Sequence, residues 1–188
     1  GFPVSSSCVH DDIKISPDGK EIVTCGVDKT IRLWDIKTGE NIRTFRSEAG
    51  RGEVGAYYAI AISPDKKYIA AGGFFSDKRG YEMGHIRFFD YQTGKLVHVY
   101  DRLNSSIVTM EFSPPTTPFK EQMFLVSSSN GMSQFHRYHQ LKKCLDNGAF
   151  DQDYKKMDYD LGDKSCVLDF KTNPKHDQFL LVMERWKH

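Results

Sequence analysis

The chain has 188 residues, of which 26 are basic and 25 acidic, so its formal net charge is only +1. This balance argues against the strongly basic face that nucleic-acid binding needs. No apolar run approaches the roughly 18 residues of a membrane span. The hydrophobic content of 39% is enough for a core and excludes a disordered chain. We therefore expect a folded protein with no nucleic-acid partner and no membrane insertion.

The first part of the chain divides into four short strand-like segments, which we expect at residues 9–15, 21–25, 30–35 and 41–45. Apolar and polar residues alternate in the first segment, as in a half-buried strand. Pro17-Asp18-Gly19 then forms a turn, because proline presets its backbone angle and glycine tolerates a positive φ. The third segment ends in Trp34-Asp35, and the turn around Gly39 leads into the fourth.

The same order of turns and strands returns along the chain. Pro17 is followed by equivalent prolines at positions 64, 114 and 174, at intervals of 47, 50 and 60 residues. Strands are expected at 57–62, 68–73, 85–90 and 96–100, then at 107–112, 123–128, 132–138 and 141–145, and finally at 166–170 and 179–183. The second strand of each unit is a short unbroken apolar run, which is typical of a strand covered on both faces. We expect no helix longer than a turn or two.

A repeat of four short strands every 40–50 residues, with a Trp-Asp pair closing the third strand, resembles the WD40-repeat family. The resemblance implies an all-β propeller with about three and a half blades visible. The blades are expected at about 5–46, 55–101 and 105–146, with a partial fourth at about 165–188. WD40 propellers usually have seven blades, so we expect an excerpt of a larger propeller. The alternative is a complete four-bladed propeller.

The resemblance also implies roles for particular residues of the first unit. In the family, a histidine, a serine or threonine, an aspartate and the tryptophan of one blade share a hydrogen-bonded network. Thr24, Asp28 and Trp34 match three of these positions, and Ser6 stands at the histidine position. We assign Thr24, Asp28, Trp34 and Asp35 to blade stabilisation, and we expect Trp34 to be buried with its indole N–H directed toward Thr24 or Asp28.

Two insertions between expected strands suggest a binding surface. They cover residues 46–56 and 74–84, and propeller geometry brings both to the same face. Aromatic residues and arginine dominate the energetics of protein interfaces. We therefore predict a partner-binding patch that consists of Arg51, Phe74, Phe75, Arg79 and Tyr81. The alternative is that these segments are tolerated loops.

Catalysis, cofactors and metals receive no support from the sequence. No phosphate-binding glycine motif or nucleophile elbow occurs. The acidic stretch that starts at Asp151 has Lys155 and Lys156 where a calcium loop needs an oxygen ligand and a glycine. The four cysteines show no Cys-x-x-Cys pair, and Cys25 and Cys166 sit in apolar strands, which fits a reducing intracellular compartment, with the cytoplasm the first choice. We expect no enzyme activity, no cofactor and no metal.

The function that fits best is a non-catalytic scaffold for protein–protein interactions within a larger multiprotein assembly. The alternative is a regulatory or sensing propeller attached to an enzyme or motor domain. At both ends of the array, strands such as Ile13-Lys14-Ile15 or residues 179–183 are expected to pack on a neighbour, because repeat arrays take much of their stability from contacts between adjacent repeats. The remaining blades of the same protein, or a partner chain, would cover these ends.

Overall fold

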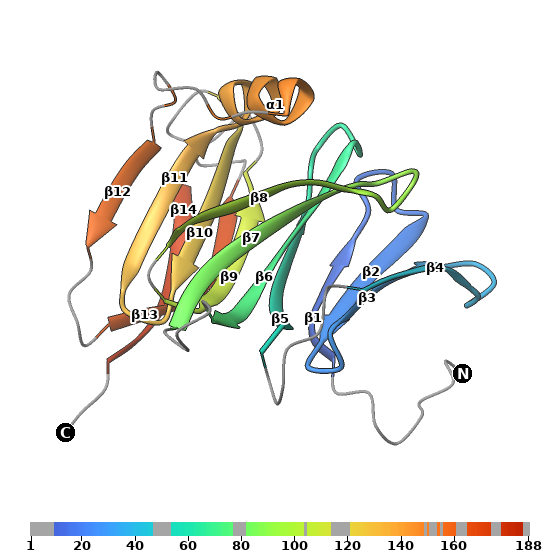
Figure 1. Ribbon diagram of the computed structural model, residues 1–188, viewed down its shortest axis with the longest axis horizontal. Helices are drawn as coiled ribbons and strands as arrows, with labels where there is room; N and C mark the ends of the chain where they lie inside the picture. The colour runs from blue at the N-terminus through green and yellow to red at the C-terminus, as the bar shows by residue number, and fades with distance from the viewer. Residues whose placement is uncertain are drawn as a thin grey trace.

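The computed structural model describes residues 10–46, 54–76, 82–103, 105–113, 121–148, 150, 154, 156–160, 165–173 and 178–185. Within these residues it contains three four-stranded antiparallel sheets, one two-stranded sheet and one helix. Figure 1 shows the sheets side by side, with the first at the right of the view and the third at the left. The expected all-β class and the repetition of four-stranded units are confirmed. Among the described residues, no helix is long and apolar enough to cross a membrane.

The first sheet consists of β1 (His10–Ile15), β2 (Glu21–Gly26), β3 (Thr30–Asp35) and β4 (Asn41–Arg46), paired in that order. Ile22 and Val23 pair with Trp34 and Leu33, so successive residues of β2 and β3 alternate between the two faces. One face buries Val23, Ile31 and Leu33 against the second sheet. The strands expected from the sequence in this unit are confirmed within one or two residues.

The second sheet consists of β5 (Ala56–Ile62), β6 (Tyr68–Ser76), β7 (Glu82–Asp90) and β8 (Leu96–Leu103). Its β6 and β7 have nine residues each, against six in β2 and β3. The segment 74–84, expected to be an insertion between strands, is therefore in large part a longer hairpin. Close backbone approach explains two glycines of this sheet: a Cβ on Gly73 would lie 2.1 Å from the Ala56 carbonyl oxygen, and one on Gly84 would lie 2.0 Å from that of Ser105.

The third sheet departs from the prediction. Its strands are β9 (Ile107–Phe112), β10 (Met123–Ser128), β11 (Met132–Arg137) and β12 (Lys156–Asp160), so the fourth strand lies beyond the range expected for this unit. The expected strand at 141–145 is wrong, because this stretch belongs to the ten-residue helix α1 (Tyr138–Asn147). The expectation that no helix exceeds a turn or two is wrong for the same reason. Gly148 ends the helix at φ 70°, a conformation that glycine adopts without strain.

A two-stranded sheet of β13 (Ser165–Asn173) and β14 (Gln178–Arg185) follows the third sheet. Its two strands match the two strands expected at 166–170 and 179–183 for the partial fourth unit.

Two apolar clusters fill the spaces between neighbouring sheets. We call the space between the first and second sheets the first seam, and that between the second and third sheets the second seam. The first seam contains Val23, Ile31, Ile60 and Phe89, and the second contains Phe88, Met110, Phe124 and Leu141 from α1. Each sheet is thus held mainly by the sheets beside it, as in other repeat arrays.

Candidate protein-interaction surfaces

A serine stands directly after the first strand in each of the three four-stranded sheets. The N–H of Ser16, Ser63 and Ser113 donates to the carbonyl oxygen of the first residue of the second strand, at 2.8–2.9 Å. The Ser16 and Ser63 hydroxyls donate to Asp18 and Asp65 at 2.6 and 2.8 Å. Gly19 and Lys66 occupy the same left-handed position, with φ of 70° and 57°. These repeated turns put equivalent residues of the three sheets at equivalent places.

The residue after the third strand is also equivalent in each sheet. Ile36, Tyr91 and Tyr138 each donate a backbone hydrogen bond of 2.9 Å to a carbonyl oxygen next to the second strand of the same sheet. The two tyrosines reach across a seam. The Tyr91 hydroxyl donates to Glu21 at 2.8 Å, and the Tyr138 hydroxyl donates to Asp65 at 2.6 Å. Each tyrosine therefore fixes its sheet to a carboxylate of the preceding sheet.

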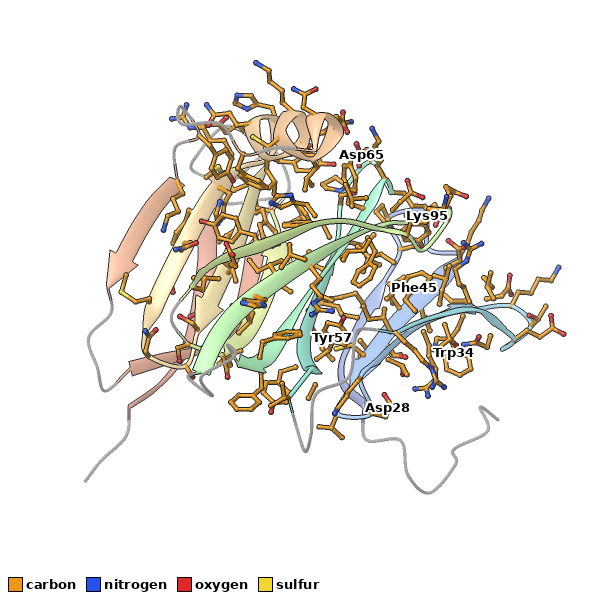
Figure 2. All side chains as sticks on the ribbon, in the orientation of Figure 1. Asp28, Trp34, Phe45, Tyr57, Asp65 and Lys95 are labelled. Atoms are coloured by element: carbon orange, nitrogen blue, oxygen red, sulfur yellow. The ribbon has the colours of Figure 1, made fainter. Side chains whose placement is uncertain are left out.

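Electrostatic contacts reinforce both tyrosine bonds. Lys66 pairs with Asp18 at 2.9 Å and with Glu21 in the first seam. Lys142 of α1 pairs with Asp65 in the second seam, where Figure 2 shows Asp65 beside the helix. Burial opposes the charged form of Asp65, but the hydrogen bonds from Lys142, Tyr138 and Ser63 outweigh burial and lower the pKa of Asp65 to about 2. Burial and the bond to Asp65 both raise the pKa of Tyr138.

Helix α1 takes the place of a turn that the second sheet uses. In the second sheet the turn around Gly94 packs on Phe45 and Arg43 of the first sheet. In the third sheet the chain instead continues into α1, and Phe150 packs on His98 and Tyr100, the equivalent positions of β8. The helix adds a second contact, since Asp146 pairs with Lys67 at 2.6 Å and accepts the hydroxyl hydrogen of Tyr68. The second seam therefore includes contacts from a helix, which the first seam does not have among the described residues.

The opposite face of the first sheet is exposed. Ile13, Ile15 and Ile36 have 58%, 64% and 39% of their surface accessible. We call these three residues the isoleucine face. Counting from the serine of each turn, the equivalents of Ile13 are Ile60 and Met110, both fully buried in a seam. The equivalents of Ile36 are Tyr91 and Tyr138, which are 2% and 5% exposed. The isoleucine face therefore has the composition of a seam and lies open to solvent.

The residues assigned to blade stabilisation lie in the first sheet and its turns, where each makes a hydrogen bond to a nearby residue of the same blade. The Trp34 indole N–H donates to the Thr24 hydroxyl at 3.0 Å, and Asp35 accepts the Thr38 N–H at 2.7 Å to close the next turn. Asp28 accepts hydrogen bonds from the Thr30 N–H and hydroxyl and pairs with Arg32 at 2.6 Å. Trp34 is half-buried, so the expectation of a buried side chain is met only in part, whereas the expected direction of its indole N–H is confirmed.

We predict that the Trp34 contact stabilises the first sheet measurably. Trp34→Phe keeps an aromatic ring but removes the donor to Thr24, whose side chain is buried. The expected loss in the free energy of unfolding is about 1 kcal/mol. A double-mutant cycle with Thr24→Val, measured by denaturant titration, isolates the bond. A coupling energy near zero would show that this hydrogen bond does not hold the sheet.

The predicted partner-binding patch is only partly described by the structure. Arg51, Arg79 and Tyr81 lie outside the described residues. Phe74 is half-buried. Phe75 requires a correction, because it is 3% exposed: its ring packs edge-on against Tyr57 and stacks on His85, and the Arg87 guanidinium lies 4.6 Å from the ring centroid. Phe75 belongs to the core of the second sheet and does not face a partner.

No group of three or more histidine, cysteine, aspartate or glutamate residues within the described part of the chain is arranged to hold a metal ion. The side chains of Cys25 and Cys144 are both buried. Sequence reasoning missed the roles of Tyr91 and Tyr138. The available signal was an aromatic residue directly after the third strand in two successive units, at Asp90-Tyr91 and Arg137-Tyr138.

Comparisons with known proteins agree with this architecture. Residues 3–35 match the family model for the WD domain, G-beta repeat. The chain is 32% identical over 102 residues, 54% of its length, to eukaryotic translation initiation factor 3 subunit I of Phaeosphaeria nodorum. It is 29% identical over 103 residues, 55% of its length, to meiotic recombination protein rec14 of Schizosaccharomyces pombe. These matches cover 26% and 30% of the two relatives.

Solved structures give the same fold. The crystal structure of the RRP9 WD40 repeats superposes with a TM-score of 0.60 at 12% identity, covering 95% of this chain and 52% of that one. The structure of U3-55K superposes with a TM-score of 0.59 at 14% identity, covering 87% and 46% of the two chains. Adjacent four-stranded antiparallel sheets that share apolar seams are the blades of a β-propeller. Residues 3–35 match one WD40 repeat, and the chain has the fold of WD40-repeat propellers, so the resemblance seen in its sequence is confirmed.

Proposed function

We propose that this chain is a non-catalytic scaffold for protein–protein interactions within a larger intracellular assembly. The observation that carries the proposal is the isoleucine face, where three large apolar side chains are exposed in positions that the other two blades bury or half-bury. Exposed apolar patches mark interaction surfaces in folded proteins. One of the relatives is a subunit of a translation initiation factor, which supports a role in an assembly.

The structure of the seams supports a particular kind of cover for the isoleucine face. In both seams a sheet packs its apolar residues on these positions of the next sheet. A further propeller blade, from the same protein or from a partner chain, has the matching shape and composition. Because Ile36 stands where Tyr91 and Tyr138 bind carboxylates, the covering blade needs an apolar residue there instead of a glutamate or aspartate.

Crosslinking of the native protein tests the proposal. The tagged protein, expressed from its own locus, is purified at physiological salt and treated with a lysine-reactive crosslinker. We expect a stable multiprotein assembly in which Lys20 and Lys37, both exposed on the first sheet, crosslink to another sheet-forming segment. Ile15→Asp should reduce these crosslinks, whereas Lys143→Glu, on the exposed side of α1, should not.

Two results would contradict the proposal. One is a protein that purifies alone, with its lysines crosslinked only to one another. The other is catalytic or motor activity on the same polypeptide, which would favour the regulatory or sensing propeller instead.

A further inference from the structure

The outer strand of the first sheet is a free edge. Among the described residues β4 pairs only with β3, so half of the backbone N–H and C=O groups of β4 point away from the sheet. The strand carries Arg43 and Arg46 and no acidic residue, and Ile42 is 45% exposed. In Figure 1 this strand lies at the outer side of the first sheet, away from the second seam.

A third cation comes to this edge from the second sheet. The side chain of Arg43 packs on Gly94, and the next residue along the chain is the exposed Lys95. Figure 2 shows Lys95 near Phe45, which belongs to β4 like Arg43. Arg43, Arg46 and Lys95 form what we call the basic edge. Several other cations of the described residues pair with carboxylates: Arg32 with Asp28, Lys66 with Asp18, and Lys67 with Asp146.

No described carboxylate pairs with any of the three cations of the basic edge. Because the chain as a whole has a net charge of only +1, the excess of positive charge here is local. Two cations on adjacent elements without an anion between them repel each other, and an anionic partner relieves this repulsion.

We propose that the basic edge binds an acidic, extended segment of a partner protein, which adds to β4 as a fifth strand of the first sheet. Backbone hydrogen bonds to the free edge would provide affinity. Carboxylates on the face that carries Arg43 and Lys95 would provide specificity, and apolar side chains on the opposite face of the segment would cover Ile42. A second copy of β4 is disfavoured, because it would place like charges opposite each other. This inference names a partner chemistry for the proposed scaffold and rests on that function.

A fluorescence anisotropy titration tests the inference on the purified protein. The probe is a labelled peptide of about ten residues that alternates glutamate and valine, and the matched control alternates lysine and valine. We expect binding of the acidic peptide only. The double substitution Arg43→Glu with Lys95→Glu should weaken binding by roughly tenfold or more, because each attraction becomes a repulsion. The matched double substitution Lys20→Glu with Lys143→Glu, which changes the net charge equally, should leave binding unchanged.

Amide hydrogen exchange provides the second readout. The bound acidic peptide should slow exchange in β4, which a purely electrostatic contact with side chains would not do. The inference is overturned if both peptides bind alike, if the control variant loses binding equally, or if protection appears away from β4. Equal competition by heparin and by the peptide at β4 would instead indicate a general polyanion site. Protection of β4 without peptide, together with a dimer in light scattering, would indicate a second copy. Failure of these experiments leaves the crosslinking test of the scaffold unaffected.

Discussion

Phe124→Ala is expected to lower the free energy of unfolding by about 3–5 kcal/mol, because it removes a fully buried ring and leaves a cavity. Phe124 lies in the second seam, with its ring centroid 4.6 Å from that of Phe112, 5.8 Å from that of Phe88 and 5.7 Å from that of His136. It therefore joins the second blade to the third. Urea titration followed by intrinsic fluorescence measures the loss.

Leu96→Ala is the matched control for this experiment. Leu96 is 49% exposed at the start of β8, so its removal should change the free energy of unfolding by less than about 0.5 kcal/mol. A loss at Phe124 no greater than the loss at Leu96 would contradict the packing of the second seam.

Asp65→Asn is expected to lower the free energy of unfolding by about 1 kcal/mol at pH 7, because solvent screens part of the charge of this exposed carboxylate. The Asp65 carboxylate accepts hydrogen bonds from the Tyr138 hydroxyl at 2.6 Å, the Ser63 hydroxyl at 2.8 Å and Lys142. An asparagine carries no charge for Lys142 and offers one oxygen in place of two. Asp146→Asn, at the more exposed carboxylate of α1, should cost less, under about 1 kcal/mol.

The effect of Asp65 should depend on pH in one direction. The pKa of Asp65 is about 2 in the folded protein, whereas an unperturbed aspartate has a pKa of 3.8. A group whose pKa is lowered by folding stabilises the protein above its unfolded pKa, and this contribution is lost as the pH falls through the folded pKa. The stability difference between the wild type and Asp65→Asn should therefore be constant from pH 7 to about 5 and shrink between about pH 4 and 2. A difference independent of pH would show that Asp65 acts through shape and not through charge.

The first blade could be predicted in detail because its local signals agree. Pro17 and Gly19 fix one turn, and Asp35 and Gly39 fix another, so four short strands follow with little freedom in register. The contact between Trp34 and Thr24 could also be anticipated, since the blade repeat places these residues on adjacent strands. Local turn chemistry and strand alternation suffice where the repeat is regular.

The third blade could not be predicted as well, because its fourth strand is displaced by an inserted helix. Tyr138, Leu141 and Leu145 recur at helical spacing and are buried on one side of α1. A short apolar stretch at the expected position of a strand was interpreted as that strand. Phe75 was misplaced for a related reason: an aromatic residue in a longer segment was attributed to a loop, although the segment continues β6 and turns Phe75 into the core.

The exposure of the isoleucine face was expected in outline from the order of the repeats, but its extent is a property of the folded chain. The equivalence of Ile36 with the buried Tyr91 and Tyr138 becomes visible only when the backbone hydrogen bonds after the third strand of each sheet are compared. Likewise, the basic edge joins residues that are 52 positions apart in the sequence, Arg43 and Lys95, and no local pattern brings them together.

The most direct test of the account is the solvent accessibility of the isoleucine face in the native assembly. Ile36→Cys places a thiol on this face, while Cys25 and Cys144 are buried and serve as internal controls. Thiol labelling is followed by site-resolved mass spectrometry on the assembled protein and on the same protein after salt dissociation. We predict rapid labelling of position 36 after dissociation and strong protection in the assembly. Equally rapid labelling in both states would contradict the claim that this face is covered by another blade.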